Sequence, residues 1–237
     1  LDAAFLRAYE DGKPVVTPNH LKWNANAPTE GELTFVAGNP GTTSRLLTMS
    51  QLESLRDHQI PTTLIQNSEL RGRLSEYSTQ GDVEKRVALD PIFGRENGFK
   101  VNYGQLGALT DPTFMGKKRE EEAELRQRVA ADPALAERIG DPWSDLEKVQ
   151  STARDIYLPY RQLEGNAGGG STLYSYARAI VRASKERAKP VAERRAGYSD
   201  SDIAALGRRL ASEAPIVKGI EEIQLSFWLS KTREYLT

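Results

Sequence analysis

Residues 43–55, Thr-Ser-Arg-Leu-Leu-Thr-Met-Ser-Gln-Leu-Glu-Ser-Leu, mark a change in the hydrophobic pattern of the sequence. From this point the apolar residues return every three to four positions, which is the period of an α-helix, and Thr43 or Ser44 can serve as the N-cap. The positions that share one helical face are Leu46, Leu47, Met49, Leu52 and Leu55. The stretch therefore predicts that a helical region begins near residue 46.

The residues before this point have a β-type pattern. Ala4, Leu6 and Ala8 alternate with Ala3, Phe5 and Arg7, as on the two faces of a strand, and Glu10-Asp11-Gly12 predicts a turn. Residues 33–37 form a second short β-type run, which Gly31 precedes and the turn sequence Gly-Asn-Pro-Gly of residues 38–41 ends. We expect two strands of an antiparallel barrel here.

Proline and glycine divide the remainder into helices of ordinary length. The expected boundaries are Pro61, Gly81-Asp82, Asp111-Pro112, Asp132-Pro133, Gly140-Asp141-Pro142, residues 165–170, Pro190, Gly197 and Pro215. Ser199 offers an N-cap, and residues 216–236 predict the last amphipathic helix. The predicted fold class is mainly α (α+β), with part of a β-barrel in residues 1–45 and a multi-helix domain in residues 46–237.

Composition excludes several classes of protein. The 237 residues carry 32 Lys and Arg against 33 Asp and Glu, so no net charge attracts nucleic acid or an anionic membrane. Cysteine is absent, which excludes disulfide scaffolds and thiolate metal sites, and no apolar run is long enough to span a membrane. Because the first residue is Leu1 and a strand pattern starts at once, we expect a fragment of a longer chain.

The octet Asp-Ala-Ala-Phe-Leu-Arg-Ala-Tyr of residues 2–9 resembles the segment of trypsin-like peptidases in which an aspartate leads a strand. In those enzymes the buried carboxylate accepts a hydrogen bond from the catalytic histidine and stabilises the imidazolium that forms during acyl transfer. Residues 31–41 look like a later strand of the same barrel and follow at a suitable distance. The resemblance identifies Asp2 as the catalytic aspartate.

A closer resemblance is to serine peptidase family 46, the dipeptidyl-peptidase 7 and 11 type, whose trypsin-like barrel is interrupted by a helical domain. Three stretches carry it, namely residues 2–9, 31–45 and 225–236. The resemblance implies a Ser-His-Asp exopeptidase that releases dipeptides from peptides with a free N-terminus. It further implies that residues 46–237 form a cap over the cleft and that no cofactor or metal is needed. The complete protein is expected to be periplasmic or secreted, and a homodimer is compatible with the family.

In that family an asparagine of the helical domain helps to hold the substrate's α-amino group, in a stretch similar to Asn-x-Trp/Leu-Lys-Asn. The corresponding run here is Asn-Gly-Phe-Lys-Val-Asn, residues 97–102, and Val101 occupies the place of the second asparagine. The resemblance therefore implies a substrate-binding role for Asn97 or Asn102. The alternative is that an asparagine beside Gly98 serves a turn or a cap.

The other two triad residues are expected outside this chain. His20 and His58 both follow Asp2, whereas the histidine of trypsin-like chains precedes the aspartate. The run Gly-Gly-Gly-Ser of residues 168–171 lacks the Gly-x-Ser-Gly nucleophile pattern, and we interpret it as a flexible linker with Ser171 as an N-cap. With two histidines and no cysteine, the usual transition-metal ligand clusters cannot form.

The basic residues between Arg178 and Arg195 lack interleaved aromatic residues, so a solvated helix face is favoured over nucleic-acid binding, with an acidic protein partner as the next alternative. Trp23, Trp143, Phe227 and Trp228 are expected in core or interdomain packing. The rival to a peptidase is a non-catalytic helical protein-interaction module. It would be favoured if the parent chain lacked an upstream histidine and a downstream Gly-x-Ser-Gly.

Overall fold

The computed structural model describes residues 5–35, 37–38 and 44–237. The chain divides into two units, Leu1–Arg45 and Leu46–Thr237. Helices make up most of the second unit, and the described residues contain one sheet of two strands. The prediction of a mainly α chain is confirmed.

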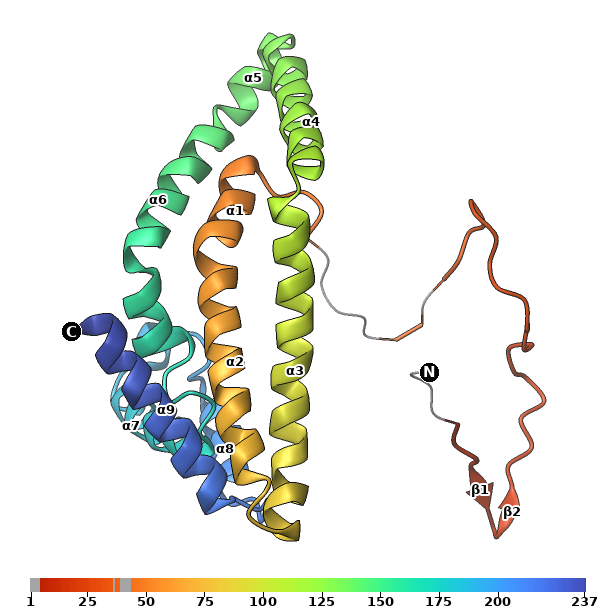
Figure 1. Cartoon of the computed structure of the whole chain (residues 1–237), viewed down its shortest axis with the longest axis vertical. Coiled ribbons are helices and arrows are strands. Elements are labelled where there is room, and N and C mark those ends of the chain that lie inside the picture. Colours follow the sequence, from red (N-terminus) through yellow and green to blue (C-terminus); the bar gives the residue numbers. More distant parts are fainter. Residues whose placement is uncertain (1–4, 36, 39–43) are drawn as a thin grey trace. The chain divides into compact units, whose positions relative to one another are not determined.

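The first unit contains a short β-hairpin formed by β1 (Tyr9–Glu10) and β2 (Lys13–Pro14) (Figure 1). The two strands are antiparallel, with Tyr9 opposite Pro14 and Glu10 opposite Lys13. Between them Asp11 and Gly12 have φ angles of 49° and 74°. A tight hairpin turn requires positive φ at both central positions, and Asp-Gly is one of the pairs that adopt it most readily. The predicted turn is confirmed.

The remainder of the first unit does not show the predicted part of a β-barrel. Residues 5–8 lie outside any strand, although the N–H of Val15 donates to the carbonyl of Ala8 at 3.1 Å. Residues 32–35 have no strand conformation, and Val36 and residues 39–41 lie outside the described residues. Alternation specifies which side chains share a face, but a strand forms only with a hydrogen-bonding partner. The described residues of this unit supply one hairpin.

The second unit begins with one continuous helical run. It consists of α1 (Met49–Ser54), the π-helical segment η1 (Leu55–Gln59) and α2 (Ile60–Tyr77). Pro61 does not end a helix here, so the boundary predicted at this residue is wrong. Proline has no N–H and its ring clashes with the carbonyl four residues back, and the wider π-turn directly before Pro61 relieves both problems.

Most other predicted boundaries are confirmed. The hairpin partner of α2 is α3 (Asp82–Thr110), followed by α4 (Pro112–Ala130), α5 (Pro133–Ile139), α6 (Pro142–Tyr160) and the π-helical η2 (Arg161–Gly165). Asp111, Asp132 and Asp141 are the N-caps of α4, α5 and α6, and each carboxylate accepts a hydrogen bond from a backbone N–H in the first turn. The Asp-Pro dipeptides therefore start helices, because aspartate satisfies a free N–H and proline at the first position needs none.

The C-terminal part consists of α7 (Thr172–Arg187), the 3₁₀ turn η3 (Val191–Glu193), α8 (Asp200–Leu210) and α9 (Lys218–Leu236). Ser171 and Ser199 are the N-caps of α7 and α8, as predicted. Ser199 also completes a capping box with Asp202.

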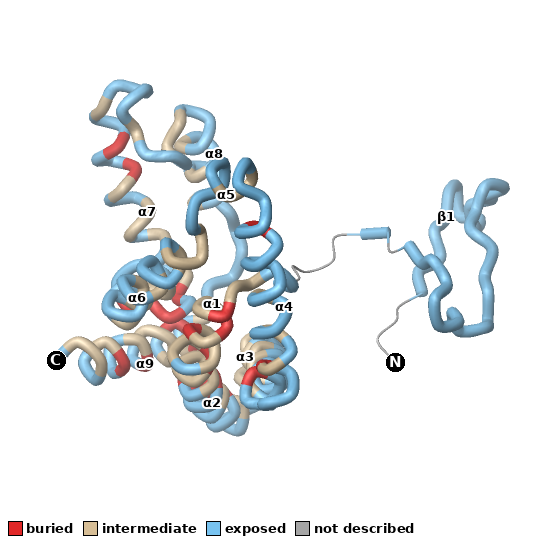
Figure 2. The backbone as a smooth tube through the Cα atoms, turned by 90° about the horizontal axis from the view of Figure 1, so that it is seen from above, coloured by how far each residue is buried: buried red, intermediate tan, exposed pale blue. Residues whose placement is uncertain are grey.

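The core of the second unit lies where α2 and α3 pack along each other and α9 crosses α2 (Figures 1 and 2). One apolar cluster lies where α1, the start of α2, the end of α3 and the start of α4 pack together. It contains Met49, Leu52, Ile60, Leu109 and Met115. The other lies between α2, α3 and α9 and contains Leu70, Leu74, Ala88, Ile220 and Phe227. Each fully buried large side chain contributes about 1.5–3 kcal/mol. The α2–α3 hairpin is thus a well-packed support for the other helices of the second unit.

The predicted core packing of aromatic residues is found for Phe227 and Trp228 but not for Trp23. Phe227 is 3 % exposed and belongs to the core, and the partly buried Trp228 packs on Tyr174 with ring centroids 4.8 Å apart. In the first unit Trp23 is 81 % exposed, so it is not a core residue of that unit. Its ring lies 6.1 Å from that of Phe5. Interdomain packing of Trp23 stays a prediction.

Candidate functional site

The predicted catalytic residue Asp2 lies outside the described residues. Its catalytic role therefore stays a prediction that rests on the sequence around it. The site residues that the structure does place are Asn97 and Asn102, both in the second unit.

Asn97 and Asn102 are interior residues of α3, so the alternative that either one serves a turn or a helix cap is wrong. Asn97 is exposed. Asn102 is partly buried, and its Nδ2 donates to the carbonyl of Gly98 at 2.7 Å, one helical turn back. Because Nδ2 is used within the helix, the side-chain oxygen of Asn102 is its remaining acceptor. Residues five apart on a helix point in different directions, and of the two asparagines only Asn97 is an exposed residue.

Close packing against α2 fixes the orientation of this part of α3. A Cβ atom at Gly98 would lie 3.1 Å from Nδ2 of Asn67 on α2, so even a methyl group at position 98 would require the Asn67 side chain to shift slightly. One position on, the Phe99 ring lies under the Arg71 guanidinium at 5.1 Å and is stacked on Tyr103 at 6.0 Å. Asn97 is therefore presented from a rigid surface, which favours a binding role because little entropy is lost on contact.

The glycine turn, residues 168–170, is a second built feature. The φ angles of Gly168, Gly169 and Gly170 are 84°, 63° and 99°, a region that favours glycine. Gly168 and Gly169 are buried, and a Cβ atom would lie 2.6 Å from Cγ of Tyr174 at the first and 2.9 Å from the carbonyl oxygen of Gln224 at the second. The interpretation of this run as a flexible linker is wrong, because three positive φ angles let the backbone pack tightly against α7 and α9.

A buried carboxylate from α9 holds the end of the glycine turn. Glu221 is 6 % exposed, and its two oxygens accept hydrogen bonds from Ser171 Oγ at 2.5 Å, Thr172 N at 2.9 Å and Leu173 N at 3.1 Å. These N–H groups belong to the first turn of α7, where the helix dipole also favours negative charge. Burial raises the pKa of the Glu221 carboxyl, but the hydrogen bonds outweigh it, and the pKa lies below its ordinary value. Glu221 is thus a charged structural cap.

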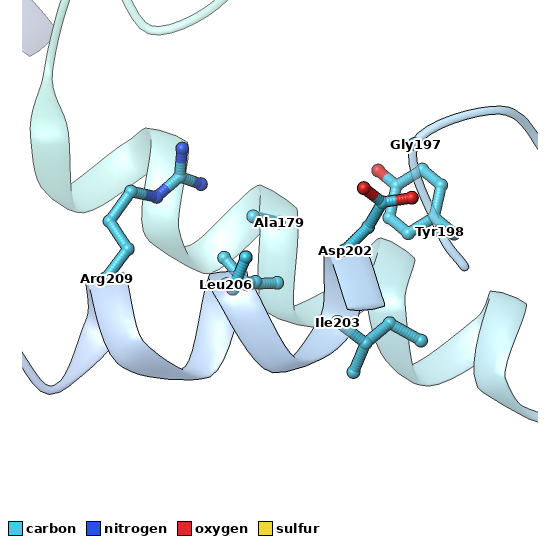
Figure 3. A pocket seen from close by; sticks show the side chains of 8 residues that line it. Ala179, Gly197, Tyr198, Asp202, Ile203, Leu206 and Arg209 are labelled. Atoms are coloured by element: carbon cyan, nitrogen blue, oxygen red, sulfur yellow. The ribbon is translucent and has the colours of Figure 1, made fainter. Parts of the chain in front are cut away.

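The carboxylate that lines the groove between α7 and α8 is engaged in capping α8. It is lined by residues of both helices and of the loop before α8, including Tyr198, Asp202, Leu206 and Arg209 (Figure 3). Its carboxylate, Asp202, accepts hydrogen bonds from Oγ and N of Ser199 at 2.6 and 3.0 Å. These bonds lower the pKa of Asp202, so the carboxyl is a helix cap and not a proton donor near neutral pH.

Within the described part of the chain, no group of His, Cys, Asp and Glu residues is arranged to hold a metal ion. His20 is exposed, with Nδ1 2.9 Å from the carbonyl oxygen of Thr17, and His58 is partly buried in η1. Among the described residues, no helix is both long and apolar enough to cross a membrane.

Comparison with known proteins assigns the chain to a family. The family model described as Peptidase S46 matches residues 1–237. The chain belongs to this family. It is also 27 % identical over 254 aligned residues to the Asp/Glu-specific dipeptidyl-peptidase of Shewanella putrefaciens. That alignment covers 99 % of this chain and 33 % of the relative, so the chain spans about a third of its length. The family resemblance drawn from residues 2–9, 31–45 and 225–236 is confirmed.

In this S46 chain the basic residues of α7 and the following loop are largely paired. Glu164 accepts hydrogen bonds from both Arg178 and Arg182, and the latter pair is 2.7 Å apart. Arg194 binds Asp200 at 2.7 Å, and the pattern is that of an ion-paired surface. The hydrogen bond from Arg182 is the main cause of the lowered pKa of Glu164. These contacts agree with the interpretation as a solvated helix face.

Sequence reasoning about the S46 chain missed the role of Glu221. Ser171 was predicted as an N-cap from its place before a helix, but its buried acceptor lies 50 residues further on. Glutamate in an amphipathic helix is usually solvent-exposed. A signal that could have drawn attention to the turn is the run of three glycines, which suits positive φ as well as flexibility.

Proposed function

We propose that the complete protein carrying this chain is a serine exopeptidase that releases dipeptides from the N-termini of peptides. The observation that carries the proposal is the Peptidase S46 match over residues 1–237. The relative named as a dipeptidyl-peptidase, which aligns with 99 % of this chain, supports the same reaction. Since that relative is named Asp/Glu-specific, peptides with an acidic second residue are the first substrates to test.

In the proposed mechanism Asp2 orients a histidine that precedes it in the complete protein. The histidine takes the proton of a serine hydroxyl as the serine attacks the peptide carbonyl, and it then gives this proton to the leaving amine. Water hydrolyses the acyl-enzyme in the second half of the reaction. The Asp2 carboxylate holds the correct imidazole tautomer and stabilises the imidazolium.

The helical unit is proposed to cap the cleft and to select peptides with a free N-terminus. Asn97 is the preferred ligand of the substrate's ammonium group, because its exposed side-chain oxygen can accept an N–H from it. Asn102 is the second candidate, with its amide held by Gly98 and its oxygen partly buried. The family resemblance also supports a periplasmic or secreted enzyme, and a homodimer stays a prediction.

The decisive test of the mechanism is Asp2→Asn in the complete protein. The amide keeps the shape but loses the charge and favours the wrong tautomer, so kcat should fall roughly ten-thousand-fold, about 5 kcal/mol of barrier. Asp11→Asn, at the exposed hairpin turn, is the matched control and should keep full activity. A folded Asp2→Asn enzyme with more than about a tenth of wild-type kcat would remove Asp2 from the triad.

The role of the asparagines is tested by Asn97→Ala and Asn102→Ala with a dipeptidyl substrate. We expect Asn97→Ala to raise KM about tenfold, since a hydrogen bond to a charged group is worth roughly 1.5–3 kcal/mol, while Asn102→Ala has a smaller effect. The wild-type enzyme should not cleave the same peptide after N-acetylation. If both variants keep wild-type KM, the cap selects substrates by other residues.

The alternative, a non-catalytic helical interaction module, predicts something different. It requires that the complete protein lack either a histidine before Asp2 or a Gly-x-Ser-Gly after residue 237. The purified complete protein would then release no dipeptide from any peptide tested, including those with an acidic second residue.

A further inference from the structure

Arg95 and Arg161 are two partly buried, neighbouring arginines of the helical unit that have no carboxylate partner among the described residues. Arg95 on α3 donates from Nη1 to Oδ1 of Asn67 at 3.4 Å and from Nη2 to the Gly169 carbonyl at 3.5 Å. Arg161, the first residue of η2, donates from Nε to Oε1 of Gln66 at 3.1 Å. Among the described residues, no Asp or Glu oxygen lies within the 4.0 Å of an ion pair from either side chain. Gln66, Arg95 and Arg161 are called the guanidinium cluster below.

The guanidinium cluster is rich in donors and poor in acceptors. A guanidinium group carries five N–H donors, and the two bonds made by Arg95 are both long. Gln66 is 4 % exposed, and since its oxygen faces Arg161, its Nε2 must point elsewhere; that atom is buried without a hydrogen-bond partner. The unmet hydrogen-bonding groups of Arg95 and Arg161 are all donors, which calls for an acceptor.

The charges of the two arginines add to this imbalance. Burial, followed by the nearby Arg161 guanidinium, lowers the pKa of Arg95, although arginine stays protonated in proteins. Two neighbouring positive charges repel each other, and partial burial adds to the cost unless a negative charge compensates them. Arg178 and Arg182 show the ordinary solution, because this pair shares the carboxylate of Glu164.

We propose that the guanidinium cluster binds a carboxylate or another small oxyanion. The planar guanidinium forks of arginine match the two oxygens of such a group. Arg95 and Arg161 are only partly buried, so the site is open to an incoming group. The negative group can come from a free anion in solution or from an acidic side chain elsewhere in the complete protein. The proposal does not depend on the dipeptide-releasing activity.

A free anion is tested by thermal unfolding of the complete protein in sodium acetate and sodium sulfate, against sodium chloride at equal ionic strength. At about ten times its Kd, a bound anion should raise Tm by roughly 3 °C and then saturate. The rise should disappear in Arg161→Gln and in Arg95→Gln. It should persist in Arg119→Gln, which removes the same charge from an exposed position of α4.

An acidic side chain of the protein itself is tested by comparing Arg161→Lys with Arg161→Gln. Both variants disturb packing and the bond to Gln66, but lysine keeps the positive charge. If a carboxylate occupies the site, Arg161→Lys should have the higher Tm, even where added anions have no effect. If no negative group is present, Arg161→Gln should have the higher Tm, because it removes repulsion with Arg95. That order, together with no response to acetate or sulfate, would overturn the proposal.

Discussion

Two polar clusters touch the glycine turn, and they differ in how well their charge is satisfied. The carboxylate of Glu221 accepts three hydrogen bonds from Ser171, Thr172 and Leu173. The guanidinium group of Arg95, close to Gly169, has two long bonds and no carboxylate. A buried charged group whose hydrogen-bond partners are all present has a structural role. A charged group that lacks such partners points to a missing ligand. We therefore expect substitutions around Glu221 to lower the stability strongly, and we expect the site at Arg95 to bind a negative group.

The largest effect on the satisfied cluster is expected from Glu221→Ala. The change leaves the buried Ser171 hydroxyl and the N–H groups of Thr172 and Leu173 without their acceptor, so the free energy of unfolding should fall by about 3–5 kcal/mol. Glu222→Ala, at the exposed neighbouring position, should change it by less than about 0.5 kcal/mol. Urea unfolding followed by circular dichroism measures both. Equal stabilities of the two variants would show that the Glu221 contacts contribute little.

A smaller loss is expected from Gly168→Ala. Alanine at a φ of 84° costs about 1–2 kcal/mol, and the added Cβ would collide with the Tyr174 ring, which costs about 1–3 kcal/mol more. Gly197 has a similar φ of 86° but open space where a Cβ would lie. Gly197→Ala should therefore show the backbone cost alone. If the two alanine variants are equally stable in urea, the turn is loose enough to absorb a methyl group.

The smallest effect in this comparison is a pH dependence from Glu221. Because its folded-state pKa lies below the ordinary 4.5, its contribution is fully present above that pH and is lost as the pH falls through the folded-state pKa. The difference in Tm between wild type and Glu221→Ala should therefore be constant near neutral pH and shrink in acid. A constant difference down to pH 2 would contradict the assignment.

Local patterns in the sequence were sufficient for most helix boundaries. Asp111, Asp132 and Asp141 each precede a proline, and each proves to be an N-cap. Such signals are reliable because the cap and the first turn are neighbours in the chain. The boundary predicted at Pro61 was wrong, because the preceding π-turn allows the helix to continue. No residue type near this position predicts a π-turn.

Predictions for the candidate site depended on the family resemblance, and the structure added the surroundings. Asn97 and Asn102 were selected from the run at residues 97–102, but only the helix shows that their side chains differ in exposure and bonding. The partners Asn67 and Arg71 lie on another helix, nearly thirty positions earlier in the sequence, and no pattern within α3 indicates them.

By itself, the sequence determined the mainly helical class, the positions of most caps, and the membership of a peptidase family. These properties depend on residue periods and on neighbours a few positions apart, so a linear reading contains them. Only the tertiary structure decided that the three glycines form a packed turn, that Glu221 caps α7, and that Arg95 and Arg161 lie near each other without a carboxylate partner. Glu221 and Ser171 are 50 positions apart. Charge satisfaction between such distant residues depends on how helices pack, and the hydrophobic core formed by α2, α3 and α9 sets that packing.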